Sequence, residues 1–138
     1  MSDSSSSFTP LAGRILMSVL FLVSGFFKIG GYSQMVAYSS SKGLPLASVA
    51  IACAAVLELA GGLAILVGFQ TKIAAWLLFL YLIPVTFLFH NFWAMQGAEQ
   101  QENMINLLKN AAIMGGLLIL ATYGAGPYSV DHSRAAKA

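Results

Sequence analysis

Long runs without a charged residue constrain this chain more than any other feature. Residues 15–27, 49–57, 59–71, 73–98 and 110–130 contain none, and only single ionisable residues or short polar stretches separate them. Each run, extended across one flanking charge, reaches the roughly 20 residues with which a helix spans a bilayer. Of the 138 residues, 58% are apolar and only 9% are charged, which is too little charge to cover a water-soluble fold. An integral membrane protein is therefore expected.

Start and stop signals for helices divide the chain into four spans and two tails. We expect helices over about 11–28, 46–68, 71–90 and 104–124, forming one transmembrane domain over residues 10–128. We also expect a disordered polar tail over 1–9, a polar tail over 129–138, and a short interfacial helix around 34–39. The tight link between the second and third spans predicts a hairpin. The expected fold class is all-α, an antiparallel up-down-up-down four-helix bundle.

The charged residues limit the possible location and partners of the chain. Four spans put both termini on one side, which then carries four Lys or Arg residues against three on the other. The positive-inside rule favours cytoplasmic termini, in a bacterial inner membrane. The net charge is only +2, and the Lys and Arg residues are scattered along the chain, so no nucleic-acid partner is expected. No metal motif is present, because His90 and His132 are far apart and Cys53, expected to be a buried small residue, is the single cysteine.

Glu58 is the clearest functional candidate. A charge within a spanning segment is costly and therefore suggests a role. Steps of one helical turn place Ala50, Ala54, Glu58 and Gly62 on one stripe of small residues, which lets another helix approach closely. Glu58 should thus point into the bundle, where a buried carboxylate could carry protons.

The first helix repeats this pattern. Arg14, Ser18, Phe21, Gly25 and Lys28 fall on one face, with charges at both ends, and this face should also look inward. Arg14 could then reach towards Glu58. The alternative is that its long side chain extends to the lipid headgroups.

Polar residues should gather on the membrane side opposite the termini. Connectivity places the end of the first helix, the end of the third and the start of the fourth at similar depth. Their side chains could form a pocket for a polar head group, with the ring of Trp93 stacking on a ligand ring and His90 or Lys109 exchanging a proton. The ordinary alternatives are interfacial anchoring by Trp93 and Lys28 and helix capping by asparagine. The expected ligand-binding residues are Lys28, Trp93, Asn106, Lys109, Asn110 and Arg14, and the expected catalytic residues are Glu58 and His90, with Thr86 beside them.

Several short motifs, in this order, resemble the DoxX family over nearly the whole chain. They are GR at 13–14, SGFFKI at 24–29, ELAGG at 58–62, GFQTK at 68–72, HNFW at 90–93, NLLKNAA at 106–112 and GAGPYSVD at 124–131, the last similar to the family's Gly-x-Gly-x-x-Ser-x-Asp tail. The resemblance implies a four-helix membrane protein, often described as an oxidoreductase, with quinone-linked relatives that oxidise thiosulfate. More distant look-alikes serve as cargo receptors or assembly factors.

Two functions follow as expectations. The first is a membrane component of a redox system that binds a quinone or another amphipathic ring molecule. The sequence contains no haem-ligation pattern, flavin site or dithiol, so a partner or the substrate would have to hold the electrons, and whether the chain is itself an enzyme stays open. The second is a non-catalytic accessory subunit or scaffold of a larger membrane complex, or a homo-oligomer, in which the internal charges fix helix register.

Overall fold

The computed structural model describes residues 4–137, and this part of the chain is helical with short connections. Four helices are long and apolar enough to cross a membrane: α1 (Ser4–Gly30), α3 (Ala47–Val67), α4 (Thr71–Phe89) and α5 (Gly97–Tyr123). Three shorter helices accompany them: α2 (Tyr32–Ser41), η1 (Phe92–Ala94) and α6 (Val130–Ala135). This confirms the expected all-α membrane fold with four spans. The outer surfaces of these helices therefore contact the lipid bilayer.

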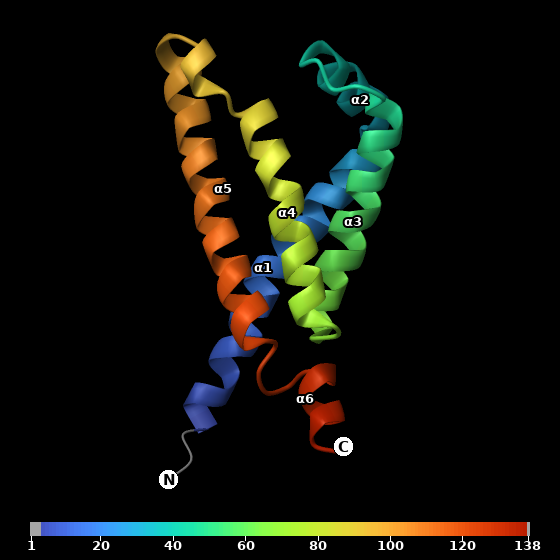
Figure 1. The fold of residues 1–138 in the computed structure, drawn as a ribbon, viewed down its shortest axis with the longest axis vertical. Coiled ribbons are helices and arrows are strands. Elements are labelled where there is room, and N and C mark those ends of the chain that lie inside the picture. The colour runs from blue at the N-terminus through green and yellow to red at the C-terminus, as the bar shows by residue number, and fades with distance from the viewer. Residues whose placement is uncertain (1–3, 138) are drawn as a thin grey trace.

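The four long helices form two pairs, because α1 packs chiefly on α3 and α4 packs chiefly on α5. Figure 1 shows α6 and the beginning of α1 at the same end of the molecule, which we call the terminal end. At the other end, α2 and the α4–α5 connection stand apart, and we call this the open end. The α3–α4 turn lies towards the terminal end (Figure 1).

The hydrophobic core lies in the terminal half of the bundle. Ile65 of α3, Leu78 of α4 and Leu117 of α5 are fully buried there. Gly61 lets α3 approach α4, since a Cβ at this position would lie 3.0 Å from the Leu78 side chain. Tight packing therefore joins the two pairs on the terminal side, and a cavity remains between them towards the open end.

Several boundaries differ from expectation. The interfacial helix expected around 34–39 is present as α2, but α5 begins at Gly97, seven residues earlier than 104, with Glu99 in its first turn where the helix dipole favours an acid. The described part of the expected N-terminal tail is helical from Ser4, and residues 1–3 lie outside the described range. Phe8 stacks on Tyr128 at 4.9 Å between ring centroids, a packing partner that the local sequence does not reveal.

The C-terminal tail is also ordered where it is described. The side-chain oxygen of Ser129 accepts a hydrogen bond of 3.1 Å from the backbone N–H of His132 and so caps α6. The polar tail expected over 129–138 thus contains a short helix that folds back on the bundle.

Candidate functional site

A buried ion pair lies between α1 and α3. The ammonium of Lys28 lies 3.0 and 2.9 Å from Oε1 and Oε2 of Glu58, and it also donates to the hydroxyl of Ser24 at 2.8 Å. Tyr81 of α4 donates its hydroxyl hydrogen to Glu58 Oε1 at 2.8 Å. The side chains of Lys28 and Glu58 are only 12% and 5% exposed. We call Lys28, Glu58 and Tyr81 the Glu58 triad; its charges are paired, as buried charges must be.

The predicted helix faces explain how the triad forms. On α1, Arg14, Ser18, Phe21 and Gly25 are buried and Lys28 is half-buried, so the expected inward face is present. A Cβ at Gly25 would lie 2.7 Å from Leu59 Cγ of α3, which shows how closely the two helices approach. This approach brings the ammonium of Lys28 to the carboxylate.

Sequence reasoning placed Lys28 and Glu58 near one pocket without pairing them, and it missed Tyr81. Tyr81 lies in the middle of a span, whereas tyrosines of membrane proteins usually gather at the interfaces. That unusual depth is the signal that could have identified it.

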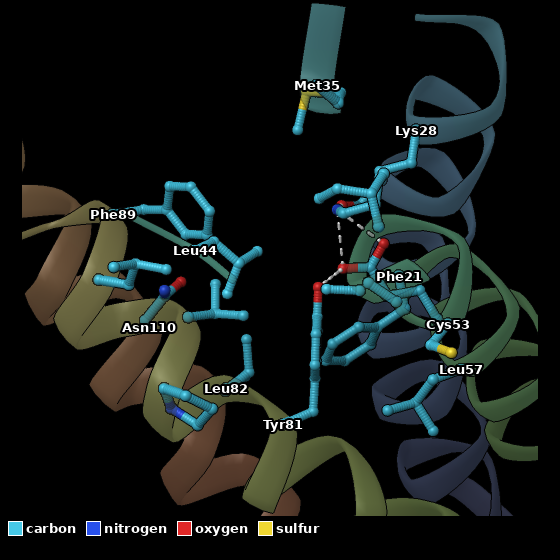
Figure 2. Close-up of a pocket in the computed structure, with 18 of the residues that line it drawn as sticks. Phe21, Lys28, Met35, Leu44, Cys53, Leu57, Tyr81, Leu82, Phe89 and Asn110 are labelled. Atoms are coloured by element: carbon cyan, nitrogen blue, oxygen red, sulfur yellow. Dashed lines mark hydrogen bonds and ion pairs between the residues drawn. The ribbon is translucent and has the colours of Figure 1, made fainter. Parts of the chain in front are cut away.

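A cavity of about 540 Å³ extends from the Glu58 triad between the two helix pairs. Figure 2 shows Leu82 and Phe89 of α4 on one side of the cavity and Lys28 and Phe21 of α1 on the other, with Tyr81 of α4 beside Phe21 and Met35 of α2 above. Most of the lining is apolar, and the polar groups are few and localised, which is the usual character of a small-molecule site. The volume lies within the range of about 300–1,000 Å³ that such sites occupy.

The cavity wall is incomplete within the membrane-spanning region. Leu20 is 43% exposed, and Cys53 and Pro84 are also exposed, although all three line the cavity. Cys53 is therefore not the buried small residue that its apolar neighbourhood predicted, because it lies on the edge of α3 facing the gap. These gaps lie within the membrane-spanning helices α1, α3 and α4.

His90, directly after the end of α4, and Asn110 of α5 line the same cavity. The side-chain nitrogen of Asn110 donates to Thr86 Oγ1 at 3.0 Å, and Figure 2 shows the Asn110 amide facing the cavity. His90 Nδ1 lies 3.2 Å from Oδ1 of Asn103, whose nitrogen donates to the carbonyl of Glu99 at 3.0 Å. The structure thus brings four of the predicted site residues, Lys28, Glu58, His90 and Asn110, to one cavity, while their functional roles stay predictions.

Asn106, Lys109 and Trp93 do not join it. Asn106 and Lys109 line a separate surface depression of α5 together with Glu102. Successive residues of a helix lie about 100° apart, so the side chain of Lys109 leaves α5 in a different direction from that of Asn110. Trp93 is 55% exposed because α4 ends at Phe89 and a 3₁₀ turn follows, which invalidates the helical extrapolation from Thr86 and His90.

Arg14 has a different role from either expectation. The residue is 1% exposed, and its guanidinium donates to the carbonyls of Leu66 at 3.3 Å, Tyr128 at 2.6 Å and Pro127 at 3.4 Å. It therefore neither reaches Glu58 nor extends to the headgroups. Leu66 lies in the last turn of α3, where a cation is favoured by the carbonyls that lack helical partners.

Asp131 completes a polar cluster at the terminal end, which we call the terminal clamp and define as Arg14, Ser129 and Asp131. Its carboxylate accepts hydrogen bonds of 2.9 Å from the backbone N–H groups of Gln70 and Thr71, at the start of α4. Burial alone would raise the pKa of Asp131, but these hydrogen bonds and the nearby Arg134 hold it below its ordinary value. The tail motif at 124–131 thus has a structural use.

Comparisons with known proteins agree with these features. The DoxX family profile matches residues 9–91. Two Escherichia coli proteins are similar over 88% of this chain: inner membrane protein YphA, 36% identical over 86% of its own length, and inner membrane protein YqjF, 38% identical over 88% of its length. The yeast ER-derived vesicles protein ERV29 is 30% identical over 57% of this chain and 26% of its own length. No solved structure matches. With the family profile, the two full-length relatives and the four spans in agreement, this chain is an integral membrane protein of the DoxX family.

Proposed function

We propose that this protein binds a small amphipathic ring molecule of the quinone class in the cavity beside Glu58, as a membrane component of an oxidoreductase system. The observation that supports this most directly is an ion pair and a tyrosine hydroxyl on the wall of a mostly apolar cavity that opens towards lipid. An apolar ring and tail fit the lining, and a polar ring substituent fits the triad. The relatives' inner-membrane location supports the same location here. The small excess of Lys and Arg on the side of the termini supports cytoplasmic termini.

The chain's own residues would bind the ring, exclude water and hold protons. Leu57, Leu82 and Phe89 supply apolar contacts, while Glu58 and His90 are the groups that could accept or release a proton at the ligand. A bound quinone would supply the two-electron, two-proton chemistry. The electron donor would be a partner protein or the substrate.

A scaffold function is the second candidate, and the surface of α5 favours it. Only 11% of the most apolar 18-residue stretch of α5 is buried, against 39% of the corresponding stretch of α3. Small residues on its outer surface, Ala111, Ala112 and Gly115, are exposed, so another membrane helix could approach closely there.

Extraction of the native ligand tests the first function against the second. Protein is purified gently from its own membrane, and bound small molecules are extracted and identified by mass spectrometry. We expect a ring compound at about one per chain in the wild type, its loss in Glu58→Gln, and its retention in the control Glu102→Gln, which changes an exposed glutamate outside the cavity. If no molecule co-purifies and both variants instead retain an active larger complex, the scaffold function is correct.

A further inference from the structure

The hydrogen-bonding groups left free around the Glu58 triad indicate which form of ligand the cavity prefers. An ammonium has three donors, and Lys28 uses them on Ser24 Oγ and on both oxygens of Glu58. The hydroxyl hydrogen of Tyr81 is used on Glu58 Oε1. The strong donors of the triad are therefore already occupied.

The acceptors of the triad are not filled. An ionised carboxylate offers about four lone-pair sites, and Glu58 receives three hydrogen bonds. One site on Oε2 therefore stays available, as does a lone pair on the Tyr81 oxygen. A hydrogen bond to a carboxylate is roughly twice as strong as one between neutral groups. Ser24 keeps its own hydroxyl hydrogen for an incoming carbonyl, but this is a weaker, neutral donor.

The opposite wall adds a further acceptor. Because the Asn103 nitrogen donates to Glu99, its oxygen faces His90 and accepts a hydrogen bond from Nδ1 of the ring, so that Nδ1 is already used as a donor. The nitrogen of Asn110 points to Thr86, which leaves its oxygen to accept a hydrogen bond from the cavity side, while its second amide hydrogen adds one neutral donor.

We infer that the cavity selects a ring that carries hydrogen-bond donors, a hydroxylated aromatic, over the same ring carrying only carbonyls or ethers. This inference rests on the proposed function, since it concerns the ligand of the same cavity. Its basis is the saturation of Lys28 and Tyr81 as donors beside a carboxylate with unused acceptor capacity. The exposed edges of the cavity at Leu20, Cys53 and Pro84 would admit such a molecule sideways from the bilayer.

Three probes of nearly equal shape test this inference. They are tetramethyl-1,4-benzoquinone, its hydroquinone and the dimethyl ether of that hydroquinone; full substitution of the ring prevents addition to the Cys53 thiol. Binding to the full chain in nanodiscs is measured anaerobically by calorimetry, with empty nanodiscs correcting for partition into lipid. Protection of Cys53, the single cysteine of the chain, from a small thiol reagent gives an independent readout.

We expect the hydroquinone to bind about tenfold or more tightly than the quinone and the ether, since one hydrogen bond to a charged group is worth at least one such factor. Asn110→Leu should reduce this preference, whereas the matched control Asn106→Leu, which lies outside the cavity, should not. Equal binding of the three probes, or tighter binding of the quinone, overturns the inference and leaves the proposed function standing. If none of the three binds or protects Cys53, the proposed function itself is wrong.

Discussion

Removing Lys28 should be far more harmful than its position near the end of a helix suggests. In Lys28→Met the stem of the side chain is kept, but Glu58 loses two hydrogen bonds and its counter-charge while remaining 5% exposed. Breaking a buried pair by removing one partner costs about 3–5 kcal/mol, whereas an exposed pair is worth about 0–1 kcal/mol. The pair of Lys28 and Glu58 is buried, so we expect Lys28→Met to lower the free energy of unfolding by about 3 kcal/mol.

The measurement is reversible unfolding in mixed micelles, followed by circular dichroism, for a double-mutant cycle. Glu58→Gln should also cost about 3 kcal/mol because it leaves the ammonium unpaired, but Lys28→Met combined with Glu58→Gln should cost no more than either single change. Lys109→Met is the matched control, because this lysine is exposed on α5; it should change stability by less than about 0.5 kcal/mol. If the two single losses simply add in the double variant, the ion pair does not stabilise the fold as argued.

Three further changes probe the triad and the terminal clamp. Tyr81→Phe removes the hydrogen bond to Glu58 and should cost about 1.5–3 kcal/mol in the same unfolding assay. The pKa of Asp131 is lower in the folded protein than its ordinary value of 3.8. The carboxylate therefore stabilises the fold above pH 3.8, and this stabilisation is lost as the pH falls through the pKa of the folded protein. Asp131→Asn should abolish this part of the acid sensitivity, which is measured as unfolding against pH. Gly68→Ala should cost about 2 kcal/mol or more, since Gly68 has a φ of 70° and a Cβ there would overlap the Arg14 guanidinium.

Each of these changes has a control in the chain. Tyr123→Phe alters a tyrosine that is 81% exposed, and a loss as large as that of Tyr81→Phe would show that the hydroxyl of Tyr81 contributes nothing specific. Glu102→Gln alters an exposed acid and should leave the acid sensitivity unchanged. Gly115→Ala meets open space at a helical position and should be neutral or stabilising, so equal effects at Gly68 and Gly115 would contradict the steric argument.

The sequence allowed prediction of what depends on helical period and connectivity. The inward face of α1 and the position of Glu58 on the small-residue stripe of α3 follow from spacing alone, and both are buried. The partner of Arg14 could not be predicted in this way. It depends on the tail after α5 folding back so that backbone carbonyls 113 and 114 residues away reach the guanidinium.

The arrangement of side chains towards the open end was predictable only in part. Depth in the membrane follows from connectivity, and it brought His90 and Asn110 to the correct level. The direction in which a side chain leaves its helix depends on how α4 and α5 pack together, through Asn110 with Thr86 and His90 with Asn103. Moving one residue along a helix rotates the direction of the side chain by about 100°, and this rotation separates Lys109 from Asn110.

The two ends of the molecule therefore differ in how their helices are joined. At the terminal end, Arg14 connects α1 with α3 and the tail, and Asp131 connects the tail with the start of α4. Towards the open end, polar contacts lie mostly within each helix pair, and Tyr81 with Glu58 is the hydrogen bond that crosses between α4 and α3 at the cavity. A ligand that binds Glu58 competes with or extends the hydrogen bond between Tyr81 and Glu58, while the terminal clamp is untouched. Ligand binding should thus affect the separation of the pairs at the open end without loosening the core around Leu78 and Leu117.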